Sequence, residues 1–356
     1  MANREGKCPK CGGALCIPEE LATFSCMYCG AVLSQEELVV PHEGEEKNQA
    51  AALEEVLQKL WENGDSKAEE LTGRILELDE YNMKANQVYA RMHFPDILFR
   101  FKNAMEHFKR SEYPDYFDAY KIKCRPAVEA VDRYALESED HGEEFMRLLA
   151  SDLMKAIDKE VESDQSLRSK NARALKCDQY KMILAVYTIP MILELKLGVS
   201  ERLTDVMVEE WMRLHPKSIL RKGTYGDMVT GFRKGKMCFI TTAVCESFGK
   251  PDDCQELQSL RKFRDTYMMK SEDGRALVEE YYEIAPAIVT CMDMDEERAG
   301  VYRSVWNTYL EPCLQDIAAG RAEACEKRYV EMVRSLEGRY LDSQIWEDHR
   351  GSDTTS

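Results

Sequence analysis

Residues 301–317 read VYRSVWNTYLEPCLQDI. Apolar side chains recur every three or four positions along the whole stretch, which is the period of one wide apolar face of an α-helix. Gly320 follows and is expected to end this helix, because glycine commonly terminates helices. A second stripe of the same period then runs from Cys325 to Tyr340. The stretch therefore predicts a helical hairpin.

The helical period extends over most of the chain. Residues 145–161 form another such stripe, and Met182 to Leu197 is the most apolar stretch. Pro190 interrupts that stretch, which is also shorter than the roughly 20 residues that a membrane-spanning helix needs, so we expect a buried helix. Strict alternation of apolar and polar residues is not seen beyond the first forty positions. The sequence predicts a mainly α protein, built of helical hairpins or a bundle with a small N-terminal β zinc ribbon.

The ribbon prediction rests on two cysteine pairs, Cys8-Pro-Lys-Cys11 and Cys26-Met-Tyr-Cys29. Each pair places two thiolates on one tight turn, and two such turns can surround a Zn²⁺ ion tetrahedrally. We therefore expect Cys8, Cys11, Cys26 and Cys29 to bind zinc and Cys16 to be left out. A closed shell of four thiolates has no position for a substrate, so the predicted site is structural.

Glycines follow both knuckles. Gly12, Gly13 and Gly30 stand where a backbone that folds around a metal needs positive φ. The interval 12–25 between the knuckles is long enough for a small hairpin, which we expect there.

Composition narrows the functional classes. The chain has 356 residues, of which 44% are hydrophobic and 32% charged, and its net charge is −17. Residues 1–40 carry three basic and five acidic side chains, which disfavours nucleic acid as a partner. The start Met-Ala-Asn-Arg has no apolar signal region, and the thirteen cysteines are mostly scattered singly along helical stretches. We expect a cytoplasmic protein without membrane segments.

We expect five segments. Residues 1–40 are the zinc ribbon, 41–105 are tetratricopeptide-like helical hairpins, 106–216 a helical domain, 217–345 a C-terminal helical domain, and 346–356 a disordered tail. The repeat-like part would place helices at 50–61 and 83–93. Only about one and a half repeats can be recognised there, fewer than a solenoid needs. An ordinary helical hairpin explains the same pattern.

Residues 215–236 form a basic, glycine-punctuated stretch in an acidic protein. We consider three interpretations. The stretch could be a solvated linker, or it could bind a phosphate or an acidic segment of a partner. In the third interpretation its basic side chains pair with the acidic surface of the same chain.

Three cysteines lie close together in sequence after this stretch. Cys238 and Cys245 share a helix face but are too far apart for a disulfide, since seven helical residues rise about 10.5 Å. Asp253 is expected to cap the next helix, with Cys254 as its first residue. Buried structural cysteines, a reactive thiol and a second metal site all remain open for this group. Only His215 lies in the same region of sequence as a possible base.

These residues resemble a known family. The residues concerned are Cys238-Phe239-Ile240, Thr242-Ala243, Leu260-Arg261, Phe263-Arg264-Asp265, Gly274, Tyr281-Tyr282 and Pro286. Together they resemble the C-terminal domain of the CFI-box proteins, a bacterial family. In that family the domain often follows varied N-terminal modules such as zinc ribbons. The resemblance covers roughly residues 230–290 and implies no particular activity. Many members continue with Ala-Tyr-Gly where this chain has Val244-Cys245-Glu246, so Cys238 is the motif cysteine.

Arg264 stands among Leu260, Phe263 and Tyr267 on one face of its expected helix. A buried arginine needs a carboxylate or carbonyl partner. We expect it to form a polar clamp between the Cys238, Arg264 and Tyr281-Tyr282 helices, and Arg261 could pair with Asp265 one turn along.

These patterns favour a non-enzymatic zinc-binding scaffold or adaptor that acts by binding a protein partner. The alternative is a thiol-based enzyme or redox sensor that uses Cys238 with Arg264 in a C-terminal pocket. Exposure of Cys238 in a cleft would favour the enzyme.

Overall fold

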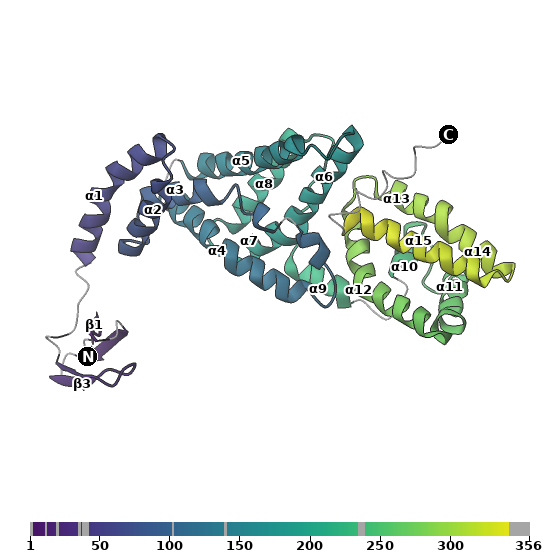
Figure 1. The fold of residues 1–356 in the computed structure, drawn as a ribbon, viewed down its shortest axis with the longest axis horizontal. Coiled ribbons are helices and arrows are strands. Elements are labelled where there is room, and N and C mark those ends of the chain that lie inside the picture. The colour runs from purple at the N-terminus through teal and green to yellow at the C-terminus, as the bar shows by residue number, and fades with distance from the viewer. Residues whose placement is uncertain are drawn as a thin grey trace. The chain divides into compact units, whose positions relative to one another are not determined.

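The computed structural model describes residues 3–10, 13–18, 21–34, 37, 43–101, 103–138, 141–233 and 239–341. Within these ranges the chain is mainly helical and carries its strands in the N-terminal region, which confirms the predicted fold class (Figure 1). The chain divides into two compact units, Met1–Tyr89 and Ala90–Ser356. The finer borders after residues 40, 105 and 216 stay predictions. The predicted disordered tail lies outside the described residues.

Four short strands form the N-terminal β region. β1 (Asn3–Lys7) pairs antiparallel with β2 (Ala14–Pro18), and β3 (Thr23–Ser25) pairs antiparallel with β4 (Val32–Ser34). The prediction of one hairpin within residues 12–25 is wrong. β2 and β3 both lie in that interval, but each pairs with the strand on the other side of its own knuckle, because a tight turn brings its two flanking strands together.

The rest of the first unit is helical. α1 (Glu43–Glu62) packs on α2 (Lys67–Leu78), and α3 (Met83–His93) follows. Gly64 adopts φ +64° in the turn between α1 and α2, where the Asp65 N–H donates to the Leu60 carbonyl at 2.9 Å. A helix pair is thus present as expected, although α1 begins seven residues earlier than predicted. The likeness to a tetratricopeptide repeat stays a prediction.

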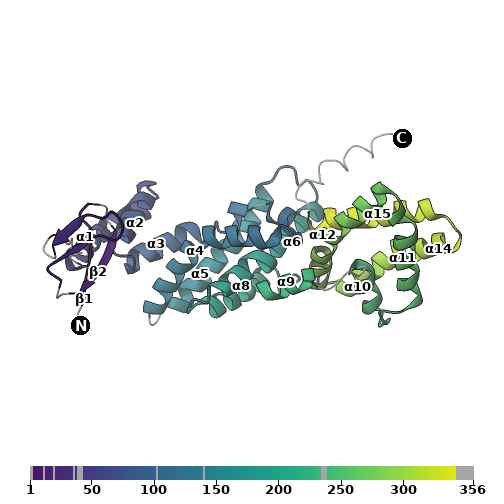
Figure 2. The same cartoon turned by 90° about the horizontal axis from the view of Figure 1, so that it is seen from below.

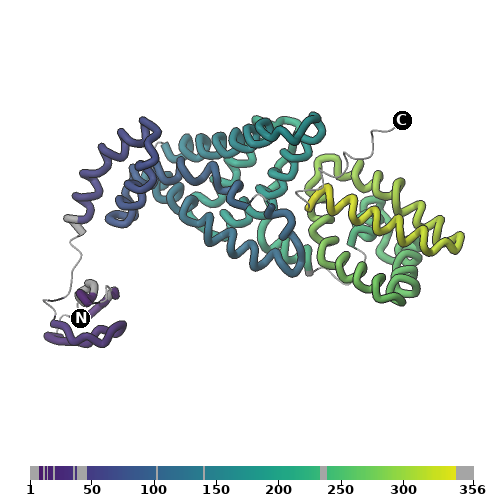
Figure 3. The backbone as a smooth tube through the Cα atoms, viewed as in Figure 1, coloured from purple at the N-terminus to yellow at the C-terminus, as the bar shows by residue number. Residues whose placement is uncertain are grey.

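The second unit consists of helices joined by short turns (Figures 2 and 3). Its longer helices are α4 (Tyr113–Glu137), α5 (Gly142–Ser163), α6 (Lys170–Ile183), α7 (Ile189–Leu195), α8 (Ser200–Leu214), α9 (Tyr225–Arg233), α10 (Phe239–Ser247), α11 (Gln255–Thr266), α12 (Glu272–Met294), α13 (Arg298–Val305), α14 (Glu311–Ala318) and α15 (Ala322–Tyr340). The unit also has five short helical segments. η2 (Phe99–Phe101), η3 (Ala104–His107) and η5 (Met268–Lys270) are 3-10 helices, and η4 (Leu184–Thr188) and η6 (Trp306–Leu310) are π helices.

Buried aromatic rings join several of these helices. Tyr113 of α4 lies 5.1 Å from Tyr187 of η4 and 5.5 Å from Phe232 of α9, measured between ring centroids. The Tyr113 hydroxyl donates to the carbonyl of Val186 at 2.7 Å. This bond satisfies the one polar group of a fully buried side chain.

Two of the helices widen into a π turn just before a proline. η4 precedes Pro190 at the start of α7, and η6 precedes Pro312 at the start of α14. Proline has no N–H and crowds the carbonyl one turn earlier, so a wider turn lets the helix continue past it. The apolar stretch from Met182 is therefore a buried helix, as predicted, with one widened turn.

The predicted C-terminal hairpin is confirmed. α13, η6 and α14 together cover the stretch 301–317, and α14 packs against α15. Gly320 has φ +71° in the turn between them. Asp316 is buried at the end of α14, where the guanidinium of Arg321 lies 2.7 Å and that of Arg328 3.3 Å from its carboxylate.

The solvated-linker interpretation of residues 215–236 is wrong for its second half. Residues 225–233 form α9, whose Met228 and Phe232 are buried. Thr224 and Asp227 cap this helix reciprocally, since each backbone N–H donates to the other side chain at 3.1 Å. The glycine-rich composition concealed this helix. Residues 234–236 lie outside the described ranges.

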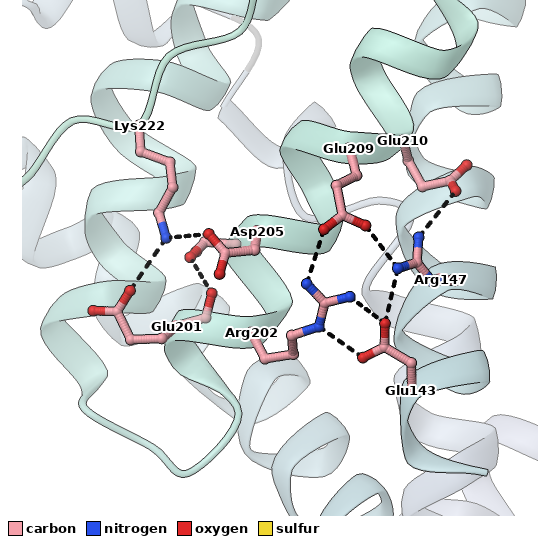
Figure 4. A network of polar contacts seen from close by, with 9 residues as sticks. Glu143, Arg147, Glu201, Arg202, Asp205, Glu209, Glu210 and Lys222 are labelled. Atoms are coloured by element: carbon pink, nitrogen blue, oxygen red, sulfur yellow. Dashed lines mark hydrogen bonds and ion pairs between the residues drawn. The ribbon is translucent and has the colours of Figure 1, made fainter.

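Acidic residues of the chain itself receive one cation of this stretch. The Lys222 ammonium lies 3.2 Å from Glu201 and 2.8 Å from Asp205, both on α8 (Figure 4). For Lys222, therefore, the interpretation of pairing with the chain's own acidic surface is correct. None of the described helices combines the length and the apolar character needed to cross a membrane.

A polar network links α5 to α8 beside this contact (Figure 4). Arg202 donates to Glu143 at 2.8 Å and to Glu209 at 2.9 Å, and Arg147 donates to Glu209 at 2.7 Å. The hydrogen bonds from Arg202 hold the pKa of both carboxyls below the ordinary value. Because the partners are almost half exposed, each pair contributes little to stability. The network mainly shows which residues of α5 and α8 lie opposite one another.

Candidate metal centre

The two hairpins of the N-terminal region orient their cysteines in the same way. The backbone N–H of Cys8 donates to the carbonyl of Gly13 at 2.9 Å, and that of Cys26 donates to the carbonyl of Ala31 at 2.8 Å. In both turns a cysteine thus bonds to the residue five positions later. The repeated bond places the two cysteines equivalently in the two knuckles.

The sulfur atoms of three predicted ligands lie together. Cys8, Cys26 and Cys29 have their Sγ atoms within 4.8 Å of one another, and the Cys8 and Cys29 sulfurs are 3.8 Å apart. Bond lengths of about 2.3 Å around a tetrahedral zinc ion separate two sulfurs by about 3.8 Å. The Lys10 N–H donates to the Cys8 sulfur at 3.4 Å. This cluster can bind a metal ion.

The fourth predicted ligand, Cys11, lies outside the described residues. Cys16 is exposed on β2 and is not part of the cluster, in agreement with the prediction. Cys8 and Cys26 are only 2% exposed and pack with Leu15 and Leu33 into a small core. The sulfur atoms therefore lie partly within the folded interior of the ribbon, shielded from water on one side.

The glycines differ in their roles. Gly30 has φ +73°, as expected, and its N–H donates to the Cys26 carbonyl at 2.8 Å. Gly13 does not have positive φ, so that prediction is wrong for it. A Cβ at Gly13 would lie 2.4 Å from the ring of Tyr28, and this close approach explains why a side chain does not fit there. Gly12 lies outside the described residues.

Of the two residues predicted for a C-terminal pocket, Cys238 lies outside the described residues and only Arg264 can be located. Arg264 of α11 is mostly buried and donates to Asp265 and to the Tyr282 hydroxyl, both at 2.7 Å. The cavity that Arg264 lines with apolar side chains of α11, α12 and α15 has a volume of about 50 Å³. That space holds only a few water molecules.

Two tyrosine hydroxyls tie these helices together. Tyr282 of α12 accepts from Arg264, while Tyr281 accepts a 3.0 Å bond from the backbone N–H of Ile240 at the start of α10. These are the contacts expected of a polar clamp between the three helices. The Ile240 N–H would otherwise be one of the unpaired donors at a helix start.

Two local predictions in this region are wrong. Arg261 does not pair with Asp265 but reaches back to Asp252, where it donates to the carboxylate at 2.6 Å and to the carbonyl at 2.9 Å. Two acceptors on one residue hold the guanidinium better than a single helix-surface partner. Cys254 is the N-cap of α11 rather than its first residue, because its backbone is extended and its carbonyl accepts the first helical bond, from Gln258 at 3.0 Å.

Cys245 does not have the surroundings of an activated thiol. Cys245 is fully buried on α10, and burial, followed by the neighbouring Cys254, raises its pKa to about 12. A thiol with that pKa stays protonated at neutral pH and is a poor nucleophile.

His215 lies elsewhere, beside Asp158 of α5 and Cys177 of α6. No sequence motif predicts this cluster, because its members are 19 and 38 residues apart along the chain. In the sequence, Cys177 and His215 are single residues on separate helical segments, and nothing there indicates that they meet.

Comparisons with protein-family models, with curated proteins and with solved structures gave no match. The resemblance to CFI-box proteins stays a prediction that rests on the residues quoted for it. Conclusions about function therefore rest on this chain's own residues, of which the cysteine cluster of the ribbon is the clearest functional feature.

Proposed function

We propose that this protein is a zinc-binding adaptor whose ribbon binds another protein. One Zn²⁺ ion is held by Cys8, Cys11, Cys26 and Cys29, three of which have their sulfur atoms together. The ion fixes the knuckles and carries out no catalytic step, since four thiolates leave no open coordination position.

The exposure of two large side chains at the second knuckle carries the proposal. Met27 is 80% and Tyr28 64% exposed, between two cysteines that the metal would fix. Neighbouring apolar side chains in water mark a contact surface more often than isolated ones do, and both types are enriched at protein interfaces. Because the Tyr28 ring lies against Gly13, folding of both knuckles positions it.

Charge favours protein over nucleic acid as the partner. The chain has a net charge of −17, and its first forty residues are more acidic than basic. Binding to a phosphate backbone requires clustered cations. A partner surface that is apolar and lacks acidic groups fits the ribbon better.

Metal analysis tests the zinc assignment. Purified protein in which Cys29 is replaced by serine should lose the zinc of the ribbon, whereas Cys16→Ser, which alters an exposed cysteine outside the cluster, should keep it. Unchanged zinc content in Cys29→Ser would refute the assignment.

Site-specific cross-linking tests the contact. A photoreactive phenylalanine analogue replaces Tyr28 in the full chain, and the matched control carries it at Tyr81, which is also 64% exposed but lies in the helical region. In a lysate of the source cells, position 28 should give a discrete adduct that disappears after chelation, and position 81 should not.

Direct binding of the purified adduct protein completes the test. The Met27→Ser/Tyr28→Ser variant should bind it at least about tenfold more weakly than the unaltered chain, a loss of about 1.4 kcal/mol. Equal affinity, or an adduct that forms equally well without zinc, would contradict the proposal.

A further inference from the structure

We propose that Asp158, Cys177 and His215 form a second zinc site, whose fourth coordination position opens into a cleft. One metal-binding atom of each residue lies within 4.8 Å of those of the other two. The Nε2 atom of His215 is 3.4 Å from a carboxylate oxygen of Asp158. This site is independent of the ribbon and of the function proposed for it.

The alignment of α5 and α8 brings two of the ligands together. Contacts between Glu143 and Arg202, then Arg147 and Glu209, advance along both helices in the same direction, so the helices run parallel (Figure 4). Asp158 lies further along α5, and the residue that follows α8 reaches it. α6 packs on α5 and supplies Cys177.

The end of α8 fixes the histidine ring. The backbone N–H of His215 donates to the Trp211 carbonyl at 2.7 Å, and its own carbonyl accepts from the Ser218 N–H at 2.8 Å. The imidazole lies against the Trp211 indole, with ring centroids 4.4 Å apart. A ring held in this way is positioned before a ligand arrives, which lowers the entropic cost of binding.

The Nε2 atom of His215 is buried but makes no hydrogen bond, because its contact with Asp158 lacks the required geometry. A buried nitrogen that makes no hydrogen bond is costly and needs an explanation. A metal ion between the imidazole and the carboxylate would use the nitrogen lone pair and one carboxylate oxygen at the same time.

The donor set indicates zinc. One thiol sulfur, one imidazole nitrogen and one carboxylate oxygen are the three ligand types that Zn²⁺ accepts in proteins. Around a tetrahedral zinc ion such atoms are about 3.4 to 3.8 Å apart. The distance between His215 and Asp158 already has this value, and the remaining ones have to shorten by no more than about 1 Å.

Two of the three proposed ligands border a cleft. Cys177 and His215 both line a cleft of about 740 Å³ in the second unit. Zinc sites with three protein ligands and one exchangeable water are of the catalytic type. The cleft is large enough for that water and for a small molecule that would replace it.

The charges around the cleft permit a cation. The Lys181 ammonium, an electrostatic neighbour of Cys177, is already paired with Asp178 at 2.9 Å and Glu296 at 3.2 Å. The charged residues that line the cleft comprise four carboxylates and three cations, Asp178, Asp295, Glu296, Glu297, Lys181, Lys217 and Arg339. The lining therefore carries no positive excess that would repel zinc.

Metal content of the full chain tests the proposal. Purified under reducing conditions and dialysed against dilute zinc, the unaltered protein should hold a second equivalent beyond that of the ribbon. Cys177→Ser and His215→Ala should each lose that equivalent only, and Cys29→Ser should lose only the other. Cys254→Ser and His141→Ala are matched controls and should lose neither, since among the described residues these two belong to no metal cluster.

Cobalt spectra test the open position. Refilled with Co²⁺, the Cys29→Ser variant should show visible bands of a site with one thiolate, and sodium azide should shift them. The Cys177→Ser variant should show the stronger thiolate absorption of the ribbon, unchanged by azide. An unaltered chain that holds a single equivalent, all of it lost in Cys29→Ser, would overturn the proposal. Bands in Cys29→Ser that do not respond to azide would overturn the open position.

Discussion

Cysteines of the second unit behave as small apolar residues. Cys124, Cys291 and Cys313 are fully buried, each among side chains of packed helices. Burial raises the pKa of Cys124 to about 12 and shifts that of Cys291 in the same direction. Such thiols stay neutral at physiological pH and are poor nucleophiles.

Replacing Cys291 by serine should destabilise the second unit by about 1–3 kcal/mol, since a hydroxyl enters an apolar site. Chemical denaturation monitored by circular dichroism measures the loss. Cys254→Ser should not destabilise the unit, since Cys254 is the N-cap of α11 and serine is a favoured N-cap residue. In the unaltered protein, Cys291 should react with an alkylating reagent only on unfolding. Rapid alkylation of the native protein would show that the site is accessible.

At the scale of elements, turns and helix pairings decide how the hairpins close. Gly320 joins α14 to α15 with φ +71°, and the buried Asp316 pairs with Arg321 next to it. Further along α15, Arg334 donates to both carboxylate oxygens of Glu280 on α12 at 2.6 Å. α15 is thus held at its start by the Gly320 turn and along its length by a bidentate ion pair to α12.

Two glycine substitutions should have opposite effects. Gly320→Ala forces a side chain into the left-handed region and should destabilise the protein by about 1 kcal/mol. Gly300 lies inside α13, where a Cβ meets nothing closer than 3.7 Å, so Gly300→Ala should stabilise by about 0.4–1 kcal/mol. Thermal or denaturant unfolding of both variants measures the signs. Equal effects would contradict the assigned backbone conformations.

The Glu280–Arg334 pair should make stability depend on pH. Hydrogen bonds from Arg334 lower the pKa of Glu280 below the ordinary value of about 4.3. The stabilisation is therefore complete above that ordinary value and is lost as the pH falls through the lowered one. The melting temperature of Arg334→Gln should lie below that of the unaltered chain at neutral pH, and the difference should vanish in acid.

Arg275→Gln is the control for this pH effect. Arg275 donates only to the carbonyls of Met269 and Lys270, which do not titrate, so its variant should show the same difference in melting temperature at every pH. A difference for Arg334→Gln that persists in acid would contradict the role of Glu280. Both partners of the pair are almost half exposed, so the effect is expected to be below about 1 kcal/mol.

At the scale of the molecule, two kinds of module are joined. Among the described residues, the ribbon has a core of four buried side chains, Cys8, Leu15, Cys26 and Leu33, two of which belong to the cysteine cluster that could hold a metal ion. So small a core cannot hold a fold without the metal. The helical unit from Ala90 onward has an extensive apolar and aromatic core of its own.

Removal of metal by a chelator under reducing conditions should therefore unfold the ribbon and leave the helices folded. Limited proteolysis with mass spectrometry should show new cleavage within residues 1–40, while the far-ultraviolet circular dichroism of helix changes little. Loss of most helical signal on chelation would contradict this division. Readdition of zinc should restore protection of the ribbon.

The sequence by itself determined what depends on neighbours along the chain. Cysteine spacing identified the three cysteines that cluster in the N-terminal region, Cys8, Cys26 and Cys29, and the helical period identified the C-terminal hairpin with its end at Gly320. Both patterns reflect local backbone geometry. Only the tertiary structure decided which side chains meet across elements. Asp158, Cys177 and His215 come together because α5 and α8 align in parallel, and Arg261 finds Asp252 in a preceding loop. These contacts depend on how the helices are aligned against one another, and that alignment produces no periodic pattern in the sequence.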